Sequence, residues 1–205
     1  MGRNHKLISK EARKKRRLQI FMSIFLAIIM LGSIFGIWAT SYTQNEIIEY
    51  SGYKFKLKEN SDYSNNAILV SKINDKEYFF YTNPNIAMNI KTEGNVTDLL
   101  SSNYLIFTVN PNDKIAQIPD AIRYEFSKLI DKQIYPAIDA YYEGYEDFPI
   151  IDCNNATKEI PVIYFKDTNT STNFTVENNC LIINLRQEEI AYARDKLLLN
   201  ILGIN

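Results

Sequence analysis

The chain has 205 residues with 23 basic and 24 acidic side chains, a single His and only 7 Gly. The one His, His5, lies near the N-terminus, so the rest of the chain cannot form Ser-His-Asp, Cys-His or HExxH sites. No GxSxG, GxxxxGK[ST] or GxGxxG pattern is present, which excludes the usual nucleotide-binding loops.

The charge is distributed unevenly along the chain. Residues 1–19 carry eight Lys and Arg against one acidic residue, Glu11, whereas the remainder has 15 basic and 23 acidic side chains. Residues 20–38 between these parts are almost entirely apolar, and as a helix they would reach about 28 Å, close to the roughly 30 Å of a hydrocarbon core. The sequence therefore predicts a basic tail at residues 1–19 and a transmembrane helix at residues 20–40.

The flanking charges also predict the orientation of this helix. Lys and Arg precede it, whereas no Lys or Arg follows it before Lys54, so the positive-inside rule places the N-terminus in the cytosol. We expect a single-pass protein of the cell membrane, with a linker at residues 41–52 and an extracytoplasmic domain at residues 53–205. A signal peptide cleaved near Ala39 is the alternative, although the apolar run is longer than the usual h-region.

Two glycines suggest a helix–helix contact within the predicted span. Gly32 and Gly36 form a GxxxG pattern, which lets two helices approach closely, so a homodimer through this helix is an alternative to a lone span. The lipid bilayer is the first expected partner, and a protein of the membrane or envelope is the second. The basic tail is explained as a topogenic signal, and we expect no nucleic-acid partner.

Strand and helix patterns follow in the acidic part of the chain. Strands are predicted at residues 53–57, 68–70, 78–81 and 105–109, the second and third forming a hairpin around Asn74-Asp75. Helical periodicity then predicts a helix at residues 119–132, with Pro119 in its first turn, and a shorter helix at residues 136–142.

The last third of the chain has the clearest pattern. Residues 162–165, 174–176 and 181–183 predict an antiparallel meander, and residues 188–202 a closing helix. The apolar face of this helix is predicted to contain Ile190, Ala193, Leu197, Leu198, Ile201 and Leu202. Because no regular βαβ alternation is present, the predicted fold class is α+β, with a mainly antiparallel sheet and two or three helices.

Two cysteines and four sequons point to an exported domain. Cys153 and Cys180 are the only cysteines, and in an oxidising compartment they predict one disulfide, since a zinc site would need more Cys or His. We expect no metal and no cofactor. The candidate glycan acceptors are Asn95, Asn155, Asn169 and Asn173.

One acidic and aromatic segment is the remaining candidate for chemistry. Residues 139–148 place four carboxylates, those of Asp139, Glu143, Glu146 and Asp147, among four aromatic rings. Carboxylates with aromatic rings are typical of glycoside hydrolases. Gly144 and Pro149 interrupt the segment, however, which favours a solvated loop, or a contact site because Tyr is enriched in interfaces.

Several short segments of the C-terminal third carry a resemblance. They are residues 153–157, 161–164, 178–183, 195–197 and 201–204. Together they resemble a group of uncharacterised, membrane-anchored archaeal proteins from small-genome lineages. The resemblance implies an archaeal surface protein with a paired Cys, and it brings no activity with it.

The sequence therefore predicts a membrane-anchored interaction or accessory domain rather than an enzyme. The alternative is a carboxylate-based hydrolase acting on surface glycans, which would need a concave pocket with two carboxylates about 5 to 10 Å apart. Without His, acid–base catalysis near neutral pH would require a carboxylate with a strongly raised pKa. Exposed carboxylates in the segment at residues 139–152 would stay ionised instead.

Overall fold

The computed structural model describes residues 21–23, 25–26, 28–30, 47–59 and 67–204. The chain divides into two compact units, residues 1–45 and residues 46–205, and each is described by itself. In the first unit the described residues are helical and exposed, Phe21 and Phe25 among them. Across all the described ranges, no helix is both long enough and apolar enough to cross a membrane.

Most of the predicted membrane anchor lies outside the described residues. This applies to the basic tail at residues 1–19, to most of the span at residues 20–40, and to Gly32 and Gly36. The transmembrane helix, its orientation and its pairing with a second helix therefore stay predictions.

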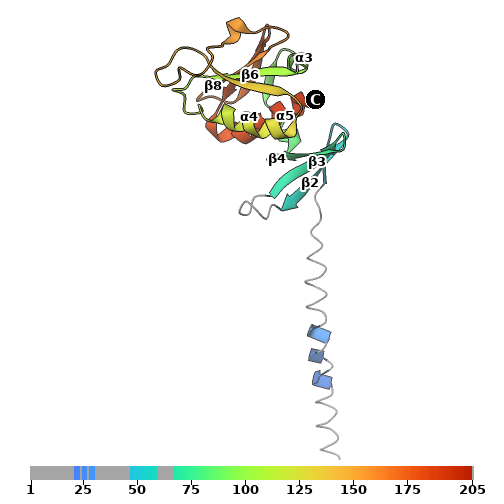
Figure 1. The fold of residues 1–205 in the computed structure, drawn as a ribbon. Coiled ribbons are helices and arrows are strands. Elements are labelled where there is room, and N and C mark those ends of the chain that lie inside the picture. Colours follow the sequence, from blue (N-terminus) through green and yellow to red (C-terminus); the bar gives the residue numbers. More distant parts are fainter. Residues whose placement is uncertain (1–20, 24, 27, 31–46, 60–66, 205) are drawn as a thin grey trace, which may run out of the picture. The chain divides into compact units, whose positions relative to one another are not determined.

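The second unit begins with an antiparallel sheet in the order β1-β2-β3-β4 (Figure 1). Its strands are β1 (Ile47–Tyr50), β2 (Tyr53–Glu59), β3 (Ala67–Ile73) and β4 (Lys76–Phe80). Asn74 and Asp75 connect β3 to β4 with φ values of 50° and 65°, which suits a two-residue hairpin turn. The predicted hairpin is confirmed, and β1 occupies part of the segment that the sequence assigned to a linker.

A six-stranded sheet follows, in the order β5-β9-β10-β8-β6-β7. Its strands are β5 (Lys91–Glu93), β6 (Tyr104–Val109), β7 (Gln133–Ile138), β8 (Val162–Asp167), β9 (Asn173–Glu177) and β10 (Cys180–Leu185). β9 and β10 pair antiparallel, whereas all the other neighbours in this sheet pair parallel. The α+β class with an antiparallel sheet is thus confirmed, but the larger sheet is mainly parallel.

The antiparallel meander predicted for the last three strands is correct for β9 and β10 but wrong for β8, which pairs with β10 in parallel. β10 lies between β8 and β9, so that Cys180 is opposite Val162 in a parallel pair and opposite Glu177 in an antiparallel pair. Residues 168–172 carry the chain from β8 past the position of β10 to β9. The tight turn at Asn178, with φ of 56°, is local, whereas the order of the strands depends on contacts between distant segments.

Helices connect and cover the strands. They are α2 (Pro84–Ala87), α3 (Val96–Leu100), α4 (Ile118–Leu129) and α5 (Ile190–Ile201), with 3-10 turns η1 (Cys153–Asn155) and η2 (Gln187–Glu189). The predicted helix at residues 119–132 is confirmed as α4, with Pro119 in its first turn. The closing helix at residues 188–202 is confirmed as η2 followed by α5.

The short helix predicted at residues 136–142 is wrong, because Pro136 lies in strand β7. β7 is an edge strand, and on its outer side the Ile138 N–H donates to the Pro149 carbonyl at 3.0 Å. Pro136 precedes Ile138 by two residues, so the N–H that it lacks would face this same outer side and no ladder bond is lost. In local sequence, a proline on an edge strand resembles a proline that begins a helix.

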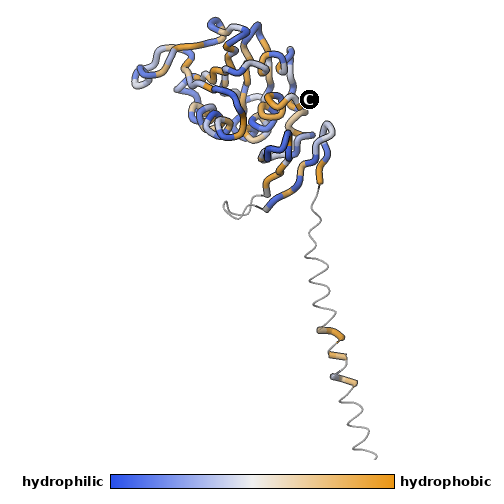
Figure 2. Tube along the Cα trace, turned by 45° about the vertical axis from the view of Figure 1, so that its right-hand side comes forward, coloured by the Kyte–Doolittle hydropathy of each residue, from blue (hydrophilic) through white to orange (hydrophobic). Residues whose placement is uncertain are grey.

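The two faces of the six-stranded sheet are covered differently. On the face that we call the helical face, Phe107, Phe165 and Ile183 belong to the main core, and α4 and α5 pack beneath the strands (Figure 1). The Phe107 ring lies 6.5 Å from the Phe126 ring of α4 and 5.2 Å from the Phe165 ring, measured between centroids. Figure 2 shows hydrophobic residues recurring along the described chain of this unit.

The opposite face, which we call the disulfide face, carries a smaller cluster. Ile106, Val162 and Ile182 pack there with Cys180 and, at the cluster's edge, Cys153. Cys153 and Cys180 form a disulfide with their Cα atoms 5.2 Å apart, which confirms the predicted pair. The bond attaches η1, and with it the segment after β7, to β10.

Candidate functional site

The carboxylates in the predicted acidic segment have different local roles. The exposed ones are Glu143, Glu146 and Asp147. The Glu146 carboxylate accepts a 2.9 Å hydrogen bond from the Gly144 N–H, which holds the pKa of Glu146 below its usual value. The Asp152 side chain accepts a 2.9 Å bond from the Asn154 N–H and so caps η1. Glu146 and Asp152 therefore shape the loop itself.

Asp139 is half-buried and directly follows β7. Its Oδ2 accepts a hydrogen bond from the Tyr164 hydroxyl on the disulfide face. Burial, reinforced by this hydrogen bond to Asp139, raises the pKa of Tyr164 far above its ordinary value, so that the hydroxyl remains a donor. The Oδ1 atom of Asp139 is buried without a hydrogen-bond partner in the part of the chain that the structure describes.

Further acids reach the carboxyl ends of the parallel strands. Asp113 follows β6 and accepts a 3.2 Å hydrogen bond from the main-chain N–H of Asp167, the last residue of β8. Open parallel sheets commonly bind ligands at this edge. Over the described ranges, however, no group of three or more His, Cys, Asp or Glu could hold a metal ion.

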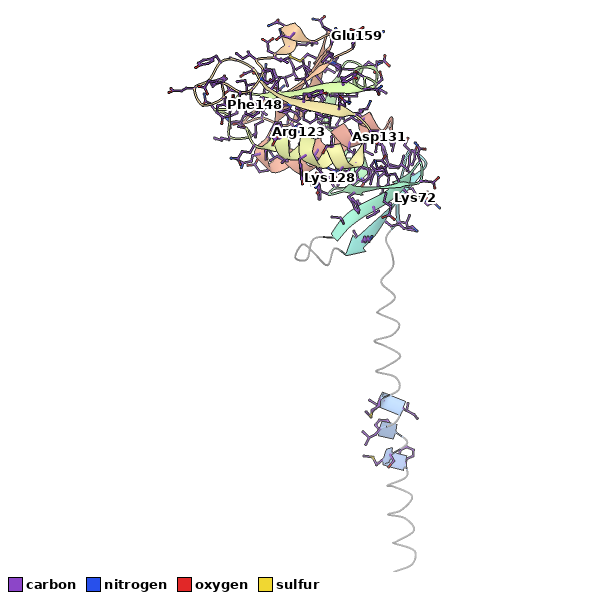
Figure 3. All side chains as sticks on the ribbon, in the orientation of Figure 1. Lys72, Arg123, Lys128, Asp131, Phe148 and Glu159 are labelled. Carbon is purple, nitrogen blue, oxygen red and sulfur yellow. A yellow bond between two sulfur atoms is a disulfide. The ribbon has the colours of Figure 1, made fainter. Side chains whose placement is uncertain are left out.

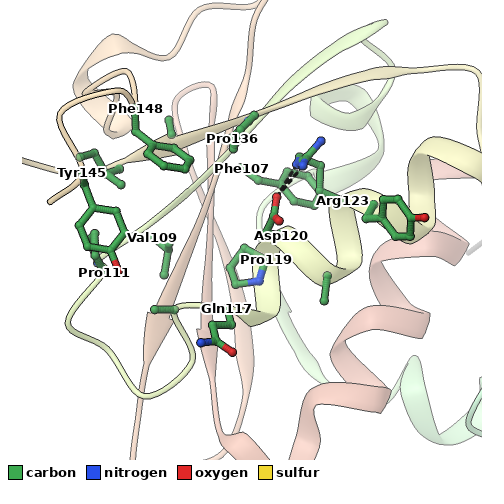
Figure 4. Close-up of a pocket in the computed structure, with 15 residues that line it drawn as sticks. Phe107, Val109, Pro111, Gln117, Pro119, Asp120, Arg123, Pro136, Tyr145 and Phe148 are labelled. Atoms are coloured by element: carbon green, nitrogen blue, oxygen red, sulfur yellow. Dashed lines mark hydrogen bonds and ion pairs between the residues drawn. The ribbon is translucent and has the colours of Figure 1, made fainter.

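A cavity of 530 Å³ opens on the helical face beside β7 (Figure 4). Phe107 and Val109 of β6 form part of its wall, with Pro119 of α4 opposite the exposed rings of Tyr145 and Phe148. The walls are mainly apolar because α4 packs across the ends of two strands there. This volume falls within the usual range of roughly 300 to 1,000 Å³ for ligand pockets.

Tyr145 and Phe148 overhang this cavity from the loop after β7. They are 38% and 42% exposed, and their ring centroids lie 6.0 Å apart. The loop is wound tightly here, because the Phe148 N–H donates to the Tyr145 carbonyl at 3.1 Å and Gly144 supplies a φ of 87°. Two large rings are thereby presented to solvent on an ordered loop.

The rim of the cavity on the α4 side is polar. Arg123 donates from Nε to the Asp120 Oδ1 at 2.7 Å, one turn apart on α4, and both residues line the cavity. Arg123 on α4 and Phe148 on the loop are both labelled in Figure 3, and both line the cavity. Because the Arg123 charge is already paired, the cation adds little net positive potential to the cavity mouth.

The cavity and the predicted carboxylates do not coincide. None of Asp139, Glu143, Glu146, Asp147 and Asp152 lines the cavity. Ile138 does line it, but Asp139 turns to the disulfide face, since successive side chains of a strand alternate. Sequence reasoning therefore located the loop but missed the cavity, whose other wall is the distant helix α4.

Sequence patterns also gave no indication of a buried ionic cluster on α5. Arg194 and Asp195 are 2% and 0% exposed, and the Arg194 Nη1 donates to the Asp195 Oδ1 at 2.7 Å. Arg194 also pairs with Glu125 of α4 and donates to the Phe79 carbonyl at 2.8 Å. The other Asp195 oxygen accepts a 2.7 Å bond from the Thr82 N–H. These bonds join α5 to the end of the antiparallel sheet.

The next residue, Lys196, is buried without a carboxylate partner among the described residues. It is 3% exposed, and its Nζ donates to the Ile90 carbonyl at 2.7 Å and to the Met88 carbonyl at 3.1 Å. Burial lowers the pKa of Lys196 to about 8. The expectation of one apolar face on α5 is thus too simple, because residues 193–200 are buried on all sides.

The four sequon asparagines occupy different environments. Asn95, Asn155 and Asn169 are exposed, whereas Asn173 is half-buried. The Asn95 side chain caps α3 by accepting from the Asp98 N–H at 3.2 Å. Asn173 lies in β9 and accepts a 2.9 Å bond from the Asn184 amide. Glycosylation stays a prediction, with Asn173 the least accessible acceptor of the four.

Comparison of the chain with protein families, with curated proteins and with solved structures finds no match. The resemblance to archaeal membrane-anchored proteins therefore stays a prediction. The candidate site rests on the geometry of the cavity beside Phe148 and on the loop that overhangs it.

Proposed function

We propose that the chain is a membrane-anchored extracytoplasmic interaction domain that binds a polypeptide segment of another protein in the cavity beside Phe148. The observation that carries this proposal is the exposure of Tyr145 and Phe148 above an apolar cavity of 530 Å³. Soluble domains rarely expose neighbouring large rings over a hollow unless the surface binds something. The predicted apolar anchor and its basic flank support attachment to a membrane.

Aromatic side chains of this kind commonly anchor protein interfaces. Tyr and Phe supply a large apolar area with few rotatable bonds, and they are enriched in the centres of interfaces. Tyr145 and Phe148 also belong to a loop that is held at both ends, by β7 and by the disulfide at Cys153. Little conformational entropy would be lost when a partner orders them further.

Addition of a partner strand to β7, the sheet edge beside the cavity, is a less suitable mode. On the outer side of β7, the Ile138 N–H already donates to the Pro149 carbonyl at 3.0 Å. Pro136 has no N–H to offer on this side, so a continuous ladder with a partner strand cannot form. Beside β7, insertion of a side chain into the cavity is therefore the mode that the described surface favours.

The test is site-specific photo-crosslinking of the full chain in its native membrane. A photoreactive amino acid in place of Phe148 should give a discrete crosslinked species with another protein. The matched control carries the same amino acid in place of Tyr135, which is 50% exposed and lies on β7, the strand before the loop, but is absent from the cavity wall. Equal crosslinking from both positions, or none from Phe148, would contradict the proposal.

A further inference from the structure

The loop that overhangs the cavity belongs to an acidic stretch of the chain. Residues 133–157 contain five carboxylates and no Lys or Arg. Two of these carboxylates, Glu143 and Asp147, are exposed on the same short loop as Tyr145 and Phe148. Neither carboxylate forms a hydrogen bond or an ion pair with any side chain that the structure describes. Their negative charge is therefore available to an incoming partner.

The opposite rim does not neutralise this charge. Arg123 is engaged by Asp120 through bonds of 2.7 Å and 2.6 Å, so this pair contributes almost no net charge to the mouth. Unpaired charge beside a binding site raises the local concentration of oppositely charged groups and repels groups of the same sign. The charge thus discriminates between classes of occupant.

The negative charge of the loop disfavours several occupants. Anionic lipid head groups and nucleic-acid phosphates would approach Glu143 and Asp147 against electrostatic repulsion. A second copy of this chain docking by the same surface would bring two identical acidic loops together, because a two-fold interface uses one patch on both partners. A polypeptide that carries Lys or Arg beside an apolar side chain is complementary both to the negative charge of the loop and to the apolar wall of the cavity.

We propose that the cavity takes one bulky apolar side chain from a partner polypeptide whose neighbouring Lys or Arg residues pair with Glu143 and Asp147. This inference rests on the proposed function and adds the chemistry of the partner. The apolar side chain supplies most of the affinity, because Phe107, Val109 and Phe148 exclude water from it. The basic residues set the specificity and accelerate association, as complementary charges at an interface rim generally do.

The test measures the binding of defined peptides to the full chain in nanodiscs of phosphatidylcholine, a lipid without net charge. The probe is a fluorescent nine-residue peptide with a central Phe and two Lys on each side in a Gly/Ser background. One comparison peptide replaces the four Lys by Glu, and a second replaces the Phe by Ser. The Lys/Phe peptide should bind at least about tenfold more tightly than either, and less tightly at high salt.

Variants of the chain separate charge recognition from apolar recognition. Glu143→Lys with Asp147→Lys should reverse the preference, so that the Glu/Phe peptide binds more tightly than the Lys/Phe peptide. Phe148→Ala should weaken the binding of the Lys/Phe peptide by about tenfold or more. Glu177→Lys is the matched control, because Glu177 is an exposed carboxylate on β9, away from the cavity wall, and should leave the preference unchanged.

The outcomes distinguish this inference from the proposed function. Equal affinity for the Lys/Phe and Glu/Phe peptides, or reversal by Glu177→Lys as well, would overturn the basic partner. If Phe148 still crosslinks a protein in membranes, the interaction site would stand with a partner of different chemistry. Failure of both the peptide binding and the crosslinking would overturn the inference and the proposed function together.

Discussion

The two faces of the six-stranded sheet reach stability by different means. On the helical face, α4 and α5 bury a continuous core that includes Phe107, Phe126 and Ile183. On the disulfide face, the cover consists of a long connecting segment that the Cys153–Cys180 bond holds against β10. On the first face a thick layer of side chains needs no covalent cross-link, whereas the thin cover on the second face depends on a covalent constraint.

This difference bears on the candidate site, because the loop with Tyr145 and Phe148 joins the two faces. The loop leaves β7 after Ile138, which lines the cavity on the helical face, and returns to the sheet through Cys153 on the disulfide face. The disulfide therefore restrains the far end of the loop that presents the two rings. Stability of the disulfide face and order of the site are expected to be coupled.

The largest effect is expected from truncating one side chain on each face of β10. Ile183 is 0% exposed in the main core, and its neighbour Ile182 is 9% exposed in the smaller cluster. Ile183→Ala should lower the free energy of unfolding toward the upper end of the usual roughly 2–5 kcal/mol, and Ile182→Ala toward the lower end. Chemical denaturation of the two variants measures the difference.

These variants are each other's control, since the same atoms are removed from adjacent residues of one strand. The loss depends on how far the surroundings can relax into the space that is left. Equal losses would mean that the segment over the disulfide face packs as tightly as the helices do, and the contrast between the faces would not hold.

The next effect concerns the disulfide itself. Replacing Cys153 and Cys180 by Ala removes a constraint over a sequence separation of 27 residues, which should cost about 3–4 kcal/mol in loop-closure entropy. Hydrogen exchange should increase mainly in residues 139–160, with little change in α4 and α5. Binding of the Lys/Phe peptide should weaken as well, because the loop with Phe148 loses one of its fixed ends.

Chemical reduction of the unmodified chain is the control for this variant. It breaks the same bond but keeps both sulfur atoms, so agreement between the two assigns the loss to the cross-link rather than to packing around Cys180. Increased exchange spread evenly over α4 and α5 would indicate instead that the bond stabilises the whole domain.

Sequence predicts those features of this domain that local residues determine. The β3–β4 turn follows from Asn74 and Asp75, which tolerate positive φ, and α4 follows from a 3.6-residue apolar period after Pro119. The disulfide follows from there being only two cysteines. The turn and the helix depend only on residues that are close together in the sequence. The disulfide is predictable because two cysteines allow only one pairing.

The features that sequence misses are those set by distant segments. β10 lies between β8 and β9, and nothing in its six residues specifies that position. Helix α5 contains three consecutive charged residues, Arg194, Asp195 and Lys196, which in a local pattern look like a solvated face. They are buried instead, because distant residues bind them: Glu125 pairs with Arg194, and the Thr82 N–H donates to Asp195. The cavity likewise needs α4 and the loop of Phe148 together.

The smallest effect expected concerns the buried charge of Lys196, within the layer that covers the helical face. Burial lowers its pKa to about 8, whereas in the unfolded chain it would be about 10.4. At a pH between these two pKa values, Lys196 is still protonated in the unfolded chain but has lost its proton in the folded one. The free energy of unfolding therefore rises with pH from about 8 to 10.4. We expect a gain on the order of 1 kcal/mol, after allowing for solvent screening.

Lys196→Met supplies the reference for this measurement, because the other Lys and Tyr residues that titrate at high pH are shared by both proteins and their effects cancel. The variant should lose stability at every pH, since the carbonyls of Met88 and Ile90 lose their donor. Only the difference in unfolding free energy between the two proteins, measured from pH 7 to 10.5, reports the titration of Lys196.

Both cysteines are disulfide-bonded, so no thiolate is present to start disulfide exchange at alkaline pH. A difference that stays constant across this range would mean that Lys196 keeps an ordinary pKa and that the helical face admits enough water to solvate its ammonium group. A difference that grows with pH would instead establish that α5 carries a desolvated cation inside the cover of the helical face.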